Sequence, residues 1–332
     1  MSRFKALRVH LQDKTATARL ETIGLDDLGP GEVVIRNAWS GINYKDALAV
    51  TGKGRILKGY PKVPGIDLAG VVEHSESAHY QPGDKVLVTG CNIGEALDGG
   101  YAEFARLPAE TLVPLPDGLT LREAMTIGTA GFTAAMALRR MLENHQAPEM
   151  GPIAVTGPTG GVGSIAIDLF KRAGFTVHAI TGKAGAADAY LKALGADEVV
   201  SRQSLTLGSK PLENALWGGA VDNLGGETLA WLTRTVRPWG NIGSIGLAQS
   251  HELQTTVMPF ILRGVSLLGI HSVEVPRAWR EDLWRRLAGE WKPRILERLV
   301  TREVTLDELP EACKDLVAGT VQGRTLVRIA GG

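Results

Sequence analysis

The chain has 332 residues, and its 36 lysines and arginines balance 36 aspartates and glutamates. This neutrality excludes an overall field that would draw the chain to nucleic acid or to an anionic membrane, and it leaves local basic patches open. Two cysteines exclude a disulfide framework. With no signal-peptide pattern and no apolar run of membrane-spanning length, the sequence predicts a cytoplasmic protein of about two domains.

The first third of the chain predicts short β-strands separated by tight turns. Gly-Pro-Gly at 29–31 and Pro-Gly-Asp at 82–84 are typical turn sequences. Strands are expected over residues 5–9, 32–38, 69–73, 85–88 and 102–106. Many short strands with close turns predict a small barrel or sandwich.

From residue 127 the pattern changes to helices alternating with strands. After a helix over 127–142, strands are expected over 153–156, 176–180, 198–200, 220–224, 241–245 and 265–270, with helices over 162–173, 186–194 and 229–236. This alternation predicts a doubly wound parallel sheet. An amphipathic helix over 278–291, with Trp279, Leu283 and Leu287 packed in the core, and a strand over 324–329 follow.

The glycine-rich run after residue 156 predicts a dinucleotide site. Gly157, Gly160, Gly161 and Gly163 lie between an apolar strand and an apolar helix, which is where a glycine turn lets the backbone approach a pyrophosphate. The free N–H groups at the helix start then face the anion. A tight turn without a ligand is the alternative.

The residues after the second strand favour NADP(H) over NAD(H). An NAD site usually has an acid there for the ribose hydroxyls, whereas this chain has Thr181, Gly182 and Lys183. Lys183 would attract the 2′-phosphate of NADPH, and Arg202 after the next strand would add a second cation. Solvated surface charges remain the alternative.

The order of these parts resembles the medium-chain dehydrogenase/reductase superfamily over essentially the whole chain. Matching motifs stand at 64–70, 82–86, 99–103 and 128–131. The resemblance implies a GroES-like β-barrel catalytic domain of residues 1–126 and 273–332, and a Rossmann domain of residues 127–272.

Zinc members of this superfamily carry Cys and His ligands at two positions that are Asn43 and Ile66 in this chain. Two distant cysteines cannot form the second, four-cysteine site of those members. We therefore expect no metal, and no alcohol oxidation through a zinc alkoxide.

Longer strings are similar to the zinc-free acrylyl-CoA reductase family, AcuI/YhdH-type, whose members are also described as quinone oxidoreductase-like. They stand at 43–48, 51–54, 128–134, 256–263 and 322–327. The resemblance implies NADPH-dependent reduction of acrylyl-CoA to propionyl-CoA. It also implies cofactor contacts at Tyr44, Thr159, Gly160, Gly161, Val162, Thr181, Gly182, Lys183, Arg202, Leu247, Ile261 and Ser272.

The expected chemistry is hydride transfer to the β-carbon of an enoyl thioester, with a proton delivered to the α-carbon. Hydrogen-bond donors in a dry cleft would stabilise the charge on the thioester oxygen without metal. Tyr44 is the candidate donor, and Asn43 is expected to face the nicotinamide or the substrate carbonyl. Tyr44 as a packing residue stays open, as does Asp67 as either an acid or a structural carboxylate.

A cationic loop follows the Asn43–Tyr44 motif. Lys53 and Arg55 stand in it among glycines, and no acid occurs from residue 47 to 66. Such a loop predicts binding of the coenzyme A phosphates, with a solvated loop as the alternative.

Two rival functions remain at this point. An NADPH-dependent quinone or enone reductase shares the fold and the hydride step, and a dehydrogenase-like binding protein would bind NADPH without turnover. A homodimer is expected, because the apolar strand at 265–270 would otherwise be an exposed sheet edge and superfamily relatives pair this strand.

Overall fold

The computed structural model describes residues 3–329, and its chain divides into two compact units. The first unit is formed by the chain up to Phe132, by Ser272–Glu290 and by the chain from Leu299 onward. The second unit is formed by Thr133–His271 and Trp291–Arg298. Within residues 3–329 no helix is both long and apolar enough to cross a membrane.

The first unit is built on a seven-stranded sheet with a β-hairpin beside it in sequence. The hairpin pairs β1 (Phe4–Gln12) with β2 (Thr15–Ile23). The sheet has the order β14-β15-β3-β4-β5-β7, with β6 also paired to β3. Its strands are β3 (Val33–Ile42), β4 (Asp67–Ser75), β5 (Lys85–Thr89), β6 (Phe104–Leu107), β7 (Val113–Pro114), β14 (Val300–Val304) and β15 (Arg324–Arg328).

Two hydrophobic clusters hold this unit together. One packs β1, β15 and two helices, α1 (Tyr44–Thr51) and α9 (Leu309–Val317), around the buried Tyr101. The other fills the space between β3, β4 and β5 with branched side chains such as Ile35, Leu68 and Val86. The carboxyl end of β3 and the start of β4 are thereby fixed on either side of α1.

The long helix α2 (Leu121–Glu143) is broken at Gly128, where φ is +51° and ψ is −162°. A residue with a Cβ rarely adopts this conformation, and the helix therefore restarts at Thr129. The sequence predicts one helix over 127–142, whereas the observed helix begins at Leu121 and is interrupted at Gly128.

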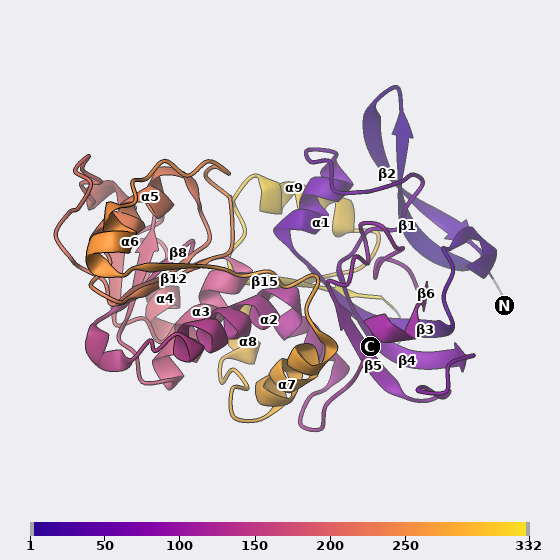
Figure 1. Cartoon of the computed structure of the whole chain (residues 1–332). Helices are drawn as coiled ribbons and strands as arrows, with labels where there is room; N and C mark the ends of the chain where they lie inside the picture. The colour runs from indigo at the N-terminus through magenta and orange to yellow at the C-terminus, as the bar shows by residue number, and fades with distance from the viewer. Residues whose placement is uncertain (1–2, 330–332) are drawn as a thin grey trace. The chain divides into compact units, whose positions relative to one another are not determined.

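The second unit contains a six-stranded parallel sheet in the order β10-β9-β8-β11-β12-β13. Its strands are β8 (Ile153–Thr156), β9 (Val177–Thr181), β10 (Glu198–Ser201), β11 (Gly219–Asp222), β12 (Asn241–Ser244) and β13 (Ser266–Gly269). Between them run α3 (Gly161–Arg172), α4 (Asp188–Leu194), α5 (Gly226–Thr235) and α6 (Met258–Arg263), with α3 and α5 on opposite sides of the sheet (Figure 1). The strand order reverses between β8 and β11, so the crevice for a ligand is expected at their carboxyl ends.

The helix expected over 278–291 differs from the observed helix in length and in its buried face. α7 spans Arg277–Ala288, and α8 (Leu296–Leu299) follows after a loop that contains Trp291. Trp279, expected in the core, is 42% exposed, whereas Trp284 is fully buried and stacks on Phe132 with ring centroids 6.1 Å apart. The buried face of α7 therefore contains Leu283, Trp284 and Leu287, and Trp279 lies outside it.

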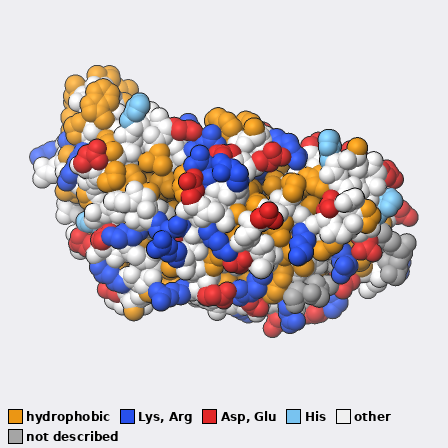
Figure 2. All heavy atoms as spheres, turned by 90° about the horizontal axis from the view of Figure 1, so that it is seen from below, with side chains coloured by type: hydrophobic (Ala, Val, Ile, Leu, Met, Phe, Trp, Pro, Cys, Tyr) orange, Lys and Arg blue, Asp and Glu red, His pale blue; other side chains and the backbone are white. Residues whose placement is uncertain are grey.

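Positive and negative side chains are interspersed on the face drawn in Figure 2, and its described part has no continuous basic region. This agrees with the balanced composition.

Candidate active site

The glycine turn of the second unit forms the approach to a helix N-terminus. β8 ends at Thr156, Gly157 adopts a φ of +57°, and its carbonyl accepts the N–H of Gly160 at 3.1 Å. α3 begins at the next residue without a side-chain cap at Gly160. A Cβ on Gly163 would lie 2.4 Å from the Gly157 oxygen, so only glycine allows the helix to pack on the turn.

A buried polar network lies next to this turn, at the ends of β8 and β11. The Thr156 hydroxyl donates to Asp222 at 2.8 Å and accepts the N–H of Asn223 at 2.9 Å, while the Asn223 amide donates to the Thr156 carbonyl. Burial raises the pKa of Asp222, and hydrogen bonds from Gly225 and Thr156 oppose this shift. The network joins the ends of β8 and β11, where the strand order reverses.

Sequence reasoning missed Asp222 and Asn223. The available signal was a polar pair at the carboxyl end of a buried strand, a position that faces the ligand crevice in doubly wound sheets.

The end of β9 carries cations at the position where an NAD site has an acid. The Arg202 guanidinium lies 3.5 Å from where a Cβ on Gly182 would be, and Gln203 donates to the Gly182 carbonyl at 3.0 Å. The Lys183 N–H donates to the Thr181 hydroxyl at 3.0 Å, which turns the chain there. This positive cluster next to a glycine fits a phosphate on the ribose.

The remaining expected cofactor residues are distributed over both units. Thr159 is buried and Val162 lies in the first turn of α3. Leu247 and Ile261 are 61% and 72% exposed, which leaves apolar surface on the second unit that a bound ligand can cover. Ser272 belongs to the first unit.

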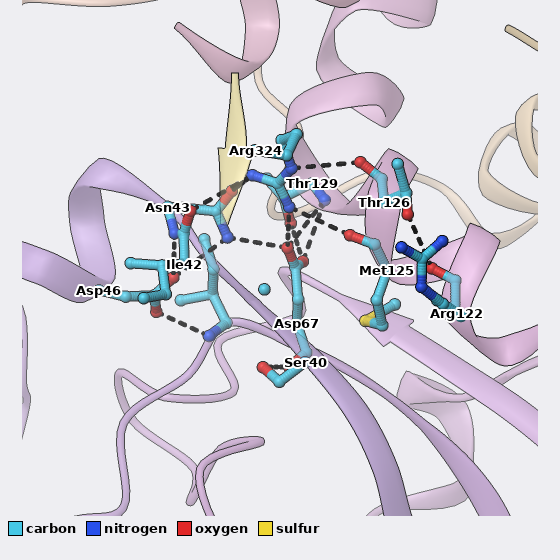
Figure 3. Close-up of polar contacts among 12 residues, drawn as sticks. Ser40, Ile42, Asn43, Asp46, Asp67, Arg122, Met125, Thr126, Thr129 and Arg324 are labelled. Carbon is cyan, nitrogen blue, oxygen red and sulfur yellow. Dashed lines mark hydrogen bonds and ion pairs between the residues drawn. The ribbon is translucent and has the colours of Figure 1, made fainter. Parts of the chain in front are cut away.

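The first unit holds a polar cluster around Asn43, at the end of β3 (Figure 3). The Asn43 amide nitrogen donates to Asp46 at 3.1 Å and to Asp67 at 2.8 Å. Its amide oxygen accepts from Arg324 Nη1 at 2.9 Å. The side chain of Asn43 is therefore engaged on all of its donors within this unit.

Asp46 is the most strongly perturbed carboxyl group of the cluster. It accepts the N–H of Asn43 at 2.9 Å and the N–H of Ile66 at 2.8 Å. Burial and the neighbouring Asp67 raise the pKa of Asp46 to about 7, despite these hydrogen bonds. The group therefore changes charge near neutral pH.

Tyr44 is the first residue of α1, and its side chain is 45% exposed. Within residues 3–329 its hydroxyl has no hydrogen-bond partner, so it is available to a substrate. A phenol hydroxyl can donate a hydrogen bond to a substrate.

The loop after α1 presents cations whose side chains have no partner among residues 3–329. Lys53 and Arg55 are exposed, and neither forms an ion pair or hydrogen bond with any residue between 3 and 329. Lys62 in the same segment lies 3.9 Å from Asp98, and Lys45 on α1 pairs with Glu95 at 2.9 Å. The free charge of this loop therefore rests on Lys53 and Arg55, together with the exposed Lys58.

The two positions that bind zinc in other superfamily members are occupied by the engaged Asn43 and by Ile66, which is buried. In the described part of the chain no three His, Cys, Asp or Glu side chains are grouped so that they could hold a metal ion. The expectation that the protein uses no metal stays a prediction.

Comparison with known proteins identifies the family. Residues 29–117 match the family model of the alcohol dehydrogenase GroES-like domain, and residues 161–289 match the model named zinc-binding dehydrogenase. The chain is 45% identical to the Bacillus subtilis protein named "Putative quinone oxidoreductase YhfP", over 98% of this chain and 99% of the relative. It is 43% identical to the acrylyl-CoA reductase AcuI of Ruegeria pomeroyi, with the same coverage.

Solved structures agree over the full length. The yhdH oxidoreductase of Salmonella enterica in complex with NADP is 42% identical with a TM-score of 0.94, covering 98% of this chain and 99% of that one. Bacillus subtilis yhfP with NAD bound is 43% identical with a TM-score of 0.95, covering 99% and 100%. This chain is therefore an oxidoreductase of the medium-chain dehydrogenase/reductase superfamily, with a GroES-like and a Rossmann unit, and a close homologue of the AcuI and YhfP proteins.

Proposed function

We propose that this protein uses NADPH to reduce the carbon–carbon double bond of acrylyl-CoA, or of a similarly short enoyl-CoA, to the saturated thioester. The observation that carries the proposal is the full-length identity of 43% to an acrylyl-CoA reductase. Exposed cations on the loop after α1 support a thioester of coenzyme A, because that loop offers its phosphates two unpaired partners.

NADPH is the proposed cofactor rather than NADH. The relatives support both readings, since one was solved with NADP and another with NAD. We give more weight to the local charge: Arg202 lies beside Gly182, and Lys183 follows it. A 2′-phosphate there would gain charge-assisted hydrogen bonds that a 2′-hydroxyl cannot make.

The residues proposed to hold the cofactor are those of the glycine turn, the end of β9 and the exposed apolar positions. They are Tyr44, Gly157, Thr159, Gly160, Gly161, Val162, Thr181, Gly182, Lys183, Arg202, Leu247, Ile261 and Ser272. When bound, NADPH would supply a hydride to the electron-poor carbon of the acceptor.

Tyr44 is proposed to deliver the proton that completes the reduction. A hydride on the β-carbon leaves an electron pair on the α-carbon and the thioester oxygen, and one proton at the α-carbon restores neutrality. The Tyr44 hydroxyl is free to donate it, whereas the Asn43 amide is held by Asp46, Asp67 and Arg324. We therefore propose that Asn43 acts by orienting the adjacent Tyr44.

The substrate is proposed to be anchored by Lys53 and Arg55. The charged head of each is in solvent, so an incoming phosphate displaces water and no existing ion pair.

The second candidate function, reduction of a quinone or enone with NADPH, is favoured by the 45% identity to the YhfP protein. Such an acceptor has no phosphates for the loop to bind.

A homodimer is also proposed. β13 is the edge strand of the parallel sheet, and Leu267 and Leu268 on it are only half-buried. An unpaired apolar edge is an association hazard that pairing with a second copy removes.

The proposal is tested by product analysis. The protein is incubated with NADPH and acrylyl-CoA in deuterated water, and the thioesters are examined by mass spectrometry. The expected product is propionyl-CoA with one solvent deuterium at the α-carbon. NADPH oxidation by a quinone without any turnover of acrylyl-CoA would select the second candidate.

A further inference from the structure

The Asn43 amide lies between two carboxyl groups and one guanidinium, which come from α1, β4 and β15 of the first unit (Figure 3). We propose that Asp67 and Arg324 are positioning residues, which fix the Asn43–Tyr44 segment so that the Tyr44 hydroxyl is oriented for proton transfer. This inference rests on the proposed function, and it concerns residues that do not themselves touch the substrate.

Asp67 ties the segment to the break in α2. It accepts the N–H of Thr129 at 3.0 Å and the Thr129 hydroxyl at 2.5 Å, as well as the Asn43 amide at 2.8 Å. The restarted half of α2 therefore has its N-terminus capped by a carboxylate from β4, where the helix dipole favours a negative charge. A Cβ on Gly128 would lie 2.6 Å from this carboxylate, so the glycine at the break also leaves the space that the Asp67 side chain occupies.

Arg324 ties the same segment to β15. Its guanidinium donates to the Asn43 amide oxygen at 2.9 Å, to the Thr126 carbonyl at 3.2 Å and to the Met125 carbonyl at 3.2 Å. It lies 3.7 Å from Asp67 and is 2% exposed. Lysine has no planar fork and cannot reproduce this set of donations.

The polarity of these contacts allows the Asn43 amide only one orientation. Its oxygen faces the cation and its nitrogen faces the two carboxyl groups, so a flipped amide would oppose every partner. Asn43 is the N-cap residue of α1, and its own N–H is held by Asp46. The backbone leading into Tyr44 is thus fixed by side chains from three elements, α1, β4 and β15.

Tyr44 depends on this fixation because nothing else holds its hydroxyl. With no partner for that hydroxyl among residues 3–329, the direction of the ring is set by the backbone and by the substrate. A displacement of about 1 Å in a reacting group costs on the order of 100-fold in rate. Loss of the Arg324 contacts should therefore lower kcat while leaving the Kd for NADPH unchanged.

A double-mutant cycle tests the inference. Arg324→Met should lower kcat by about 30- to 100-fold in the parent. In a Tyr44→Phe background the same change should lower kcat by less than about threefold, because the group being positioned is gone. The Kd for NADPH, measured by fluorescence titration, should change by less than about twofold when Arg324→Met is introduced into either background. Equal losses of kcat in the two backgrounds, or no effect of Tyr44→Phe, would overturn the proposal.

A milder pair of variants covers the case in which Arg324→Met leaves Asp67 buried without its cation and the protein does not fold. Thr129→Val removes one donor from Asp67. Thr111→Val makes the same chemical change elsewhere in the first unit, where the hydroxyl donates to the Pro108 carbonyl at 2.7 Å. Thr129→Val should lower kcat severalfold and Thr111→Val should not; equal effects would contradict the positioning role.

A spectroscopic measurement separates this inference from the proposed function. With 3-fluorotyrosine at position 44, ¹⁹F NMR should give one sharp resonance in the parent and Thr111→Val, and a shifted or broadened one in Thr129→Val and Arg324→Lys. This result needs no substrate. If acrylyl-CoA is not turned over but the resonance responds as expected, only the substrate proposal fails; an unchanged resonance in both variants overturns the positioning role.

Discussion

Asp46 should make the first unit less stable as the pH rises towards neutrality. The pKa of Asp46 is raised from 3.8 to about 7, chiefly by burial and then by Asp67. The folded state therefore holds the proton more tightly than the unfolded chain does. The stabilisation that comes from the protonated Asp46 is therefore fully present below pH 4 and is lost as the pH rises through about 7.

The magnitude follows from the size of the shift. Each pH unit between the two pKa values costs about 1.4 kcal/mol, which gives about 4 kcal/mol in all. No discount for solvent screening applies, since Asp46 is 1% exposed. The other titratable neighbours, Tyr101 and Cys313, have pKa values raised by burial and stay neutral in this range.

The assay is hydrogen exchange of the β4 amides in the parent and in Asp46→Asn, from pH 5 to pH 8, corrected for intrinsic exchange rates. Asp46→Asn should be less stable at pH 5, because asparagine cannot accept from all of the N–H groups that face Asp46. The difference in free energy of unfolding between the parent and Asp46→Asn should narrow by roughly 2 to 4 kcal/mol by pH 8, because only the parent loses stability. A gap that is constant or widens with pH would refute the argument.

Four further predictions concern binding and assembly. Gly163→Ala should weaken NADPH binding by more than about 100-fold, and Gly160→Ala, whose Cβ would lie 3.4 Å from its nearest neighbour, much less; isothermal titration compares them. Arg202→Glu should lower the NADPH-to-NADH ratio of kcat/KM by at least about tenfold, and an unchanged ratio would exclude its phosphate role. Removing the cations of the loop with Lys53→Ala and Arg55→Ala should raise KM for the thioester and not for a quinone, while Lys85→Ala on β5 serves as the exposed control. Light scattering should find a dimer that Leu268→Lys dissociates, and a monomeric parent would contradict the dimer.

The fold could be predicted because its signals are local. Strand and helix periods alternate through the second unit, and the glycines of 157–163 mark both the turn and the helix start. These features depend on a few adjacent residues, so the sequence alone is enough to recognise them. The break at Gly128 was not predicted, because the helical spacing over 127–142 is continuous across it.

The polar cluster could not be predicted because its members are far apart in the sequence. Asp67 and Arg324 are separated by most of the chain, and only the pairing of β15 with β3 brings Arg324 to Asn43. The sequence therefore left Asp67 open between an acid and a structural carboxylate, and gave no role to Arg324. Short helices such as α1 were missed for the same reason, since their buried faces are defined by packing against α9 rather than by their own period.

The prediction of the buried face of α7 was wrong because the helix contains two tryptophans and only one of them is buried. Trp279 and Trp284 both suit a core position by composition, and only the stacking on Phe132 selects Trp284. A pattern read within one helix does not contain that contact.

The account is tested most directly by measuring kcat/KM for acrylyl-CoA and for a quinone, each with NADPH and with NADH, from the loss of reduced-cofactor absorbance. We predict the highest value for acrylyl-CoA with NADPH. A preference for the quinone, or for NADH with acrylyl-CoA, would contradict the account.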